Sequence, residues 1–284
     1  MNESLQISPA IYGRATGGSS LMSSGSKPSA GSTGNLFLDS LPPESANRIL
    51  PNLDLIEAKT GAIITPAGAD VESAIFPIGA VISVVCKLLD GREAEVSLVG
   101  REGVYGLPLA LGNATSVSEA VVQIPNSMWR MTGTAFVDCM QEDRVFFKRV
   151  LSFVQVTLES TAQFSACNRL HPTNERCARW LLMAHDRVPG NEIFLTHEYL
   201  ATMLGVRRPG VSIAAAALDE AGFIEYRRGR IVVKNRRGLE SASCECYGIA
   251  NESLDRLLGY DVRKRSVPTN GLVEALVGHE NNHP

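Results

Sequence analysis

Two clusters of residues in this 284-residue chain have types and spacings that suggest chemistry at a metal. His279-Glu-Asn-Asn-His283 matches the pattern in which two histidines one helical turn apart bind zinc and the glutamate acts as a base. It lies one residue from the end of the sequence, with no residue left for a third ligand, so we predict no enzyme site there. Cys244-Glu-Cys246 brings two thiols together, but without the two-residue gap of common zinc sites. We predict no cofactor and no metal, and a mainly structural role for these cysteines, with a redox role left open.

A third group consists of arginines. Residues 165–238 hold 12 Lys and Arg against 7 Asp and Glu, and the rest of the chain holds 15 against 23. Such asymmetry is typical of a protein in which one domain meets a polyanion, although a solvated charged face is the simpler alternative. The elements that position the arginines decide between the two.

The composition limits the class of protein. With 44% hydrophobic residues, 20% charged residues and a net charge of −3, the chain can form about two folded units. No apolar run approaches the roughly 20 residues that span a bilayer, and no secretory signal is visible. We therefore expect a cytoplasmic protein without a membrane partner, whose six cysteines are thiols.

The first half of the chain predicts a tail followed by a sheet domain. Residues 1–34 contain 9 Ser and 6 Gly, which predicts a disordered tail. Residues 35–135 alternate short Val- and Ile-rich stretches with turn signals, which predicts a small β-roll or jelly roll. Asp90-Gly91, between residues 81–86 and 94–99, is the best hairpin turn.

Residues 136–170 predict one long helix. Apolar and small residues recur there at spacings of four and three, as in a coiled-coil seam: Phe146, Val150, Phe153, Thr157, Ser160, Phe164 and Cys167. We predict that this stripe is the dimer interface; the alternative is that it packs on the sheet domain. His171-Pro172 ends the helix, and a second helix follows over 173–188.

Residues 171–240 predict a winged helix-turn-helix, with a short packing helix and a loose end in 241–284. Thr196 can cap a first short helix, Gly205 can end it in the left-handed conformation, and Pro209 fits the first turn of the next helix. The hairpin after Gly222 carries arginines at its tip and is typical of a wing.

The second helix of this motif has the right size and charge for a DNA major groove. An arginine near its N-terminus can pair with guanine, so Arg208 is the base-reading candidate, whereas we assign Arg207 to phosphate. The complete set of predicted DNA contacts is Thr196, Arg207, Arg208, Pro209, Gly210, Ser212, Ile213, Arg227, Arg228 and Arg230.

These residues resemble the Crp-Fnr family of bacterial transcription regulators. The resemblance covers about residues 36–235 and is most specific at Leu200-Ala-Thr-Met-Leu-Gly-Val-Arg-Arg-Pro-Gly-Val-Ser and Leu218-Asp-Glu-Ala-Gly-Phe-Ile. It implies an α+β fold with an N-terminal β-roll sensor domain, a long dimerisation helix and a C-terminal winged helix-turn-helix. It also implies a homodimer on palindromic double-stranded DNA, with RNA polymerase as a further possible partner.

The sensor domain departs from the family pattern. Cyclic-nucleotide-binding members carry a glutamate for the ribose and an arginine for the phosphate, where this chain has Leu107 and Val117. Only Gly106 and Ser118 of that cassette remain, so we predict no cyclic nucleotide and leave the small-molecule effector unknown. No cysteine precedes Cys86, which excludes the N-terminal iron-sulfur site of other members.

Two alternatives from other classes stay open. A small-molecule or redox sensor could use its winged helix to contact a protein, which predicts weak, salt-insensitive contact with DNA. A metallohydrolase using the terminal histidines predicts zinc that is lost when the last ten residues are deleted.

Overall fold

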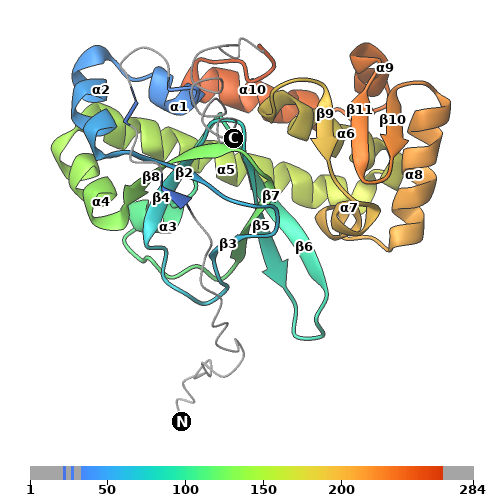
Figure 1. The fold of residues 1–284 in the computed structure, drawn as a ribbon, viewed down its shortest axis with the longest axis horizontal. Helices are drawn as coiled ribbons and strands as arrows, with labels where there is room; N and C mark the ends of the chain where they lie inside the picture. Colours follow the sequence, from blue (N-terminus) through green and yellow to red (C-terminus); the bar gives the residue numbers. More distant parts are fainter. Residues whose placement is uncertain (1–21, 24–26, 29–32, 265–284) are drawn as a thin grey trace, which may run out of the picture.

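The computed structural model describes residues 22–23, 27–28 and 33–264. They form a sheet domain (residues 22–23 and 33–142), one long helix and a winged-helix domain (residues 173–241), which confirms the predicted α+β class (Figure 1). The predicted tail lies almost wholly outside the described residues, as do the loose end after 264 and the histidine pair. No helix in the described part of the chain has the length and apolar character needed to span a bilayer.

The sheet domain consists of two four-stranded antiparallel sheets. In sheet order the first contains β1 (Met22–Ser23), β2 (Asp54–Glu57), β8 (Ser127–Thr132) and β4 (Ser73–Pro77), and the second β3 (Ile63–Thr65), β7 (Glu119–Ile124), β5 (Val81–Lys87) and β6 (Glu93–Val99). The predicted hairpin is confirmed, since β5 and β6 pair across a turn in which Gly91 has φ 82°. Short helices complete the domain: α1 (Leu36–Asp39), α2 (Pro43–Ile49), η2 (Leu50–Asn52), α3 (Leu107–Ala110) and α4 (Gly133–Glu142).

The long helix α5 (Arg144–Leu170) runs from the sheet domain to the winged-helix domain, roughly 40 Å (Figure 1). It begins where the Asp143 carboxylate accepts hydrogen bonds from the backbone N–H groups of Val145 and Phe146, both at 2.9 Å. The single helix predicted over 136–170 is therefore wrong at its start, because Asp143 is extended and separates α4 from α5. α5 ends at His171, as predicted, because Pro172 disfavours a helical residue before it.

The apolar stripe that the sequence predicted as the dimer seam faces inward at its start. Phe146, Val150 and Phe153 are at most 3% exposed and belong to the core of the sheet domain. The Phe153 ring lies so close to Gly103 that a Cβ there would be 1.9 Å from it. These three side chains therefore cannot contact a partner, and the seam predicted on them is wrong. The core of the sheet domain covers these side chains within the same chain.

The rest of that stripe is half-buried within the chain, except for the buried Cys167. Thr157, Ser160 and Phe164 line a small cavity of about 40 Å³ with residues of β6 and of the C-terminal helix α10 (Cys246–Leu258). Cys167 is 1% exposed and packs against two other cysteines.

A second stripe on α5 is exposed instead. Phe147, Leu151 and Leu158 are 38%, 39% and 66% exposed, and the half-buried Val154 lies between them. Their spacings of four, three and four are those of a coiled-coil seam. This outer stripe is the face of α5 that a second copy could cover.

The winged-helix domain contains α6 (Thr173–Arg187), α7 (His197–Leu204), α8 (Arg208–Glu220), α9 (Arg236–Ser241) and a three-stranded sheet of β10 (Ile224–Arg227), β11 (Arg230–Val233) and β9 (Glu192–Phe194). α6 is buried along most of its length, and its side chains share a core with Val81, Val85 and Leu98 of the sheet domain. The winged helix is therefore packed directly on the second sheet.

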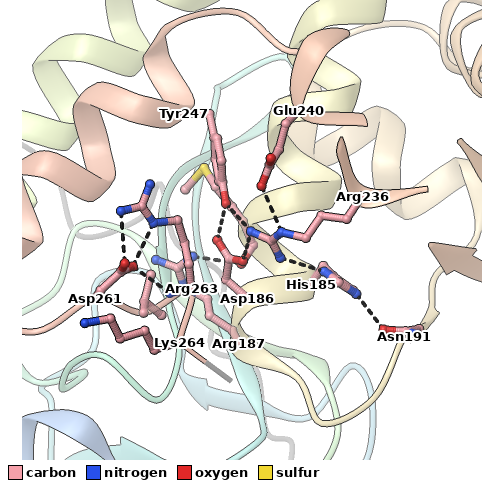
Figure 2. Close-up of polar contacts among 12 residues, drawn as sticks. His185, Asp186, Arg187, Asn191, Arg236, Glu240, Tyr247, Asp261, Arg263 and Lys264 are labelled. Atoms are coloured by element: carbon pink, nitrogen blue, oxygen red, sulfur yellow. Dashed lines mark hydrogen bonds and ion pairs between the residues drawn. The ribbon is translucent and has the colours of Figure 1, made fainter. Parts of the chain in front are cut away.

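A buried carboxylate fixes α6 to the C-terminal elements (Figure 2). Asp186 pairs with Arg236 of α9 at 2.7 Å and accepts a hydrogen bond from the Tyr247 hydroxyl of α10 at 2.8 Å. Arg236 also donates to Glu240 and to Nδ1 of His185, both at 2.9 Å. Burial raises the pKa of the Asp186 carboxyl, and the charge of Arg236 opposes that shift.

Candidate nucleic-acid interface

The turn between α7 and α8 forms as its residue types predict. Thr196 is the N-cap of α7, and its hydroxyl accepts a hydrogen bond from the Tyr199 backbone N–H at 3.3 Å. Gly205 ends the helix with φ 61° and ψ 36°, the left-handed conformation that glycine adopts without strain. Pro209 lies in the first turn of α8, where a missing N–H costs nothing.

α8 buries one face and exposes the other. Its inner face consists of Val211, Ala214, Ala215 and Leu218, as predicted from the sequence. At its N-terminus Arg207, Arg208 and Pro209 are exposed, Gly210 is half-buried, and Ile213 is 72% exposed one turn later. Neither arginine forms an ion pair within the described residues. The helix thus presents two free positive charges at the end that also carries its positive dipole.

His197 links the two helices to the wing, a role that the sequence did not reveal. Its Nδ1 lies 3.0 Å from the Ser212 hydroxyl, and its ring stacks on Tyr226 with 4.1 Å between ring centroids. Burial and the nearby charge of Arg208 lower the pKa of His197, which favours the neutral form of its ring. Ser212 is half-buried and engaged with this histidine, which leaves it less free for DNA than predicted.

The wing is the hairpin of β10 and β11. Its turn residues Arg228 and Gly229 both have positive φ, 49° and 80°, which matches the type I′ turn favoured in two-residue hairpins. β9 adds a third strand through β11, a pairing that the sequence analysis did not predict.

The basic side chains of the wing differ in what they contact. Arg227 and Lys234 pair with Glu225 at 2.8 and 2.7 Å, and Arg230 pairs with Glu192. Arg228, at the tip, is exposed and forms no ion pair with another described residue. Of the three predicted wing arginines, Arg228 is therefore the one that could pair with a phosphate without first giving up an ion pair within the described residues.

The four residues at the positions of the cyclic-nucleotide cassette carry no positive charge: Gly106, Leu107, Val117 and Ser118. Gly106 has φ 126°, and a Cβ there would lie 3.0 Å from Ala74 Cα. Leu107 begins α3, Val117 is 74% exposed, and the buried Ser118 hydroxyl lies 3.3 Å from Cys86 Sγ. Val117 thus faces solvent and does not line an enclosed apolar pocket.

Comparison with known families identifies the domain that carries this surface. Residues 175–242 match the family model of the Crp-like helix-turn-helix domain. This part of the chain is therefore similar to Crp-like helix-turn-helix domains. The match spans α6 to α9 and so contains Arg207, Arg208 and the whole wing. No curated protein matches the chain.

Solved structures of Crp/Fnr regulators share the fold of about two thirds of the chain. FixK2 from Bradyrhizobium japonicum is 16% identical with a TM-score of 0.57, over 68% of this chain and 98% of its own. A CRP-family transcriptional regulator from Thermus thermophilus is 19% identical with a TM-score of 0.56, over 66% and 95%. The c-di-GMP responsive regulator CLP from Xanthomonas campestris is 14% identical with a TM-score of 0.54, over 68% and 99%. The resemblance carried by the sequence motifs is thereby confirmed.

Proposed function

We propose that this protein is a transcription regulator that binds a palindromic DNA operator as a homodimer. The observation that carries the proposal is the pair of exposed arginines in the first turn of α8, beside a wing whose tip arginine is also without an ion pair among the described residues. One α-helix fits a DNA major groove, and residues near its N-terminus reach the base edges.

The three exposed arginines without an ion pair among the described residues have distinct roles in this proposal. Arg208, at the first position of α8, reads a guanine through two hydrogen bonds, and Arg207 meets the phosphate beside it. Ile213 projects from the same face and can contact a thymine methyl group. Arg228 neutralises a phosphate of the flanking DNA and releases counterions, which strengthens binding to every sequence alike.

The dimer of this proposal uses the outer stripe of α5. Phe147, Leu151, Val154 and Leu158 have coiled-coil spacing and are not covered by the chain's own core. Pairing two copies along this stripe would bury apolar side chains that a monomer leaves in water. It would also give the two α8 helices the two-fold symmetry that a palindromic operator requires.

The sensor function is proposed to be independent of cyclic nucleotides. A bound cyclic phosphate needs a cation, and the cassette positions supply only Gly106, Leu107, Val117 and Ser118. RNA polymerase stays a predicted partner of the DNA-bound dimer.

The test is selection of genomic DNA fragments by purified protein at low and at physiological salt. We expect a palindromic motif with wild type, loss of about 1 to 3 kcal/mol and of specificity with Arg208→Ala, and uniform weakening with a lower salt slope for Arg228→Ala. Arg227→Ala is the matched control, because that arginine is already paired with Glu225, and it should weaken binding less than Arg228→Ala.

Two results would contradict the proposal. No enriched motif at either salt would contradict DNA binding by the protein alone and would mean that an effector is required or that the winged helix serves a partner other than DNA. Equal, sequence-independent losses in Arg208→Ala and Arg228→Ala would show that Arg208 does not read bases.

A further inference from the structure

Four side chains with metal-binding atoms meet where α5 ends and α10 begins. We call them the thiol cluster: Cys167, His171, Cys244 and Cys246, whose ligand atoms all lie within 4.8 Å of one another. The three cysteines are 1%, 4% and 0% exposed, and the histidine side chain is 21% exposed. The chain brings them together from two segments more than 70 residues apart.

Two of the ligand-to-ligand distances in the thiol cluster are close to the edges of a coordination tetrahedron, and the other ligand atoms lie within 4.8 Å of one another. Zinc lies about 2.3 Å from a thiolate and about 2.0 to 2.1 Å from an imidazole nitrogen, so a tetrahedral site has edges of about 3.8 Å between sulfurs and about 3.6 Å between sulfur and nitrogen. Here Cys167 Sγ is 3.5 Å from Cys244 Sγ, and Cys246 Sγ is 3.6 Å from His171 Nδ1. The separation between the two sulfurs is much longer than the roughly 2.05 Å of a disulfide.

A second layer of polar groups orients the ligands. Nε2 of His171 lies 3.3 Å from the Glu245 carboxylate, so that nitrogen can donate its proton and leave the Nδ1 lone pair directed at the cluster. A carboxylate behind a ligating histidine is a recurrent support of zinc sites. The Gln163 amide donates to Cys246 Sγ at 3.1 Å and would stabilise a thiolate there.

Two buried cations lie beside the cluster. Arg176 and Arg179 are 7% and 4% exposed, and neither forms an ion pair with a carboxylate among the described residues. Both charges act on the Cys167 sulfur, and Arg179 lies over the Phe164 ring that packs on the cysteines. Three thiolates and one Zn²⁺ have a net charge of −1, which would give these buried arginines a counter-charge.

We propose that the thiol cluster is a structural zinc site. Three thiolates and one imidazole select a thiophilic divalent ion in tetrahedral geometry, and zinc is the usual occupant of such a set. Because all four ligands come from the protein and the sulfurs are buried, no position is left for substrate or water. The ion joins the last turn of α5 to the start of α10 and does not depend on whether the winged helix binds DNA.

The first test is metal analysis of the full-length protein, purified without a polyhistidine tag and with reducing agent present. We expect about one zinc per protomer in wild type and in the control Cys139→Ser, whose thiol lies in the sheet domain, and less than about a tenth of that in Cys244→Ser and Cys167→Ser. A variant that ends at residue 274 tests the terminal histidines. It should keep its zinc, and loss of zinc there would overturn the assignment.

A second measurement does not depend on the variants folding. Replacing zinc by Co²⁺ in wild-type protein should give the strong visible absorption of a tetrahedral thiolate centre, and a chelator should remove it and lower the Tm. Three results would each overturn the proposal. They are wild-type protein that contains no zinc, a Cys167–Cys244 disulfide that persists in the presence of reducing agent, and iron accompanied by acid-labile sulfide.

Discussion

Glu95 is a carboxylate placed between the two domains, and its replacement tests how they are joined. It lies on β6, where its two oxygens accept hydrogen bonds from the Ser83 hydroxyl at 2.6 Å and from the indole N–H of Trp180 on α6 at 2.8 Å. Burial raises the pKa of Glu95 to about 7, although these hydrogen bonds and the charges of Arg179 and Arg187 oppose the shift.

The sign of the effect on stability follows from where the proton binds. The folded protein holds the Glu95 proton up to about pH 7, whereas the unfolded chain loses it near the ordinary value of 4.5. Between these values the folded state binds more protons, so the free energy of unfolding falls as the pH rises. A shift of that size corresponds to about 3 kcal/mol, an upper value because part of the residue is accessible to solvent.

Glu95→Gln should remove this pH dependence. The glutamine amide can still accept from Trp180 and can donate to Ser83, but it carries no charge. At pH 5 the variant and wild type should unfold at similar urea concentrations, and at pH 8.5 the variant should be more stable by up to about 3 kcal/mol. Glu93→Gln, on the same strand with a side chain that is 38% exposed, is the control for removing one negative charge.

Trp180 gives an independent readout without unfolding. Its indole N–H donates to the carboxylate, so wild-type fluorescence should titrate with a midpoint near pH 7, and Glu95→Gln should lack that transition. Parallel stability curves for wild type and Glu95→Gln from pH 5 to 8.5, with no fluorescence transition, would refute the claim that this carboxylate is desolvated.

Two further predictions test the dimer and the buried ion pair. Leu158→Glu should dissociate the proposed dimer in analytical ultracentrifugation. The dimer would lose two leucines of about 2 kcal/mol each, which raises the Kd roughly a thousandfold. Leu111→Glu, exposed on the sheet domain, is the control and should leave the Kd unchanged. An unchanged sedimentation profile for Leu158→Glu would exclude the outer stripe as the seam. Asp186→Ala removes the buried carboxylate that pairs with Arg236 and accepts from the Tyr247 hydroxyl, although Arg236 keeps Glu240, and should cost about 2 kcal/mol in urea unfolding. Asp90→Ala, in an exposed pair, should cost clearly less. Equal costs for these two variants would show that the Asp186 network does not hold α6 in place.

The elements that the sequence predicted correctly are those set by local chemistry. Gly205, Pro209 and Asp90-Gly91 fix backbone dihedral angles that few other residues adopt, so their positions show where helices and turns begin or end. The end of α5 at His171 followed for the same reason, and the packing helix predicted after residue 241 is confirmed as α10.

The parts that the sequence did not predict depend on tertiary contacts. α5 carries two apolar stripes of equal spacing, one with Phe146 and one with Phe147, and periodicity cannot tell which of them the sheet domain covers. The contact of His197 with Ser212 and Tyr226 joins residues at no repeating interval. The metal pattern that does match a known spacing lies outside the described residues, whereas the thiol cluster has no such spacing because its ligands meet only in three dimensions.

The contacts that fix the winged helix on the sheet domain determine what could change its position. They include the Glu95 hydrogen bond to Trp180. The Asp186 network holds α6 to α9 and α10, and the thiol cluster ties the end of α5 to α10. The Glu95–Trp180 hydrogen bond changes with pH, and the proposed metal site in the thiol cluster would change with the supply of zinc. A ligand at the cassette positions would touch none of them, since Val117 faces solvent and Ser118 contacts Cys86. If the orientation of α8 is regulated in this protein, protons would act on it at the Glu95–Trp180 hydrogen bond and a metal ion at the thiol cluster. The measurements on Glu95 and on Cys244 test these two contacts separately.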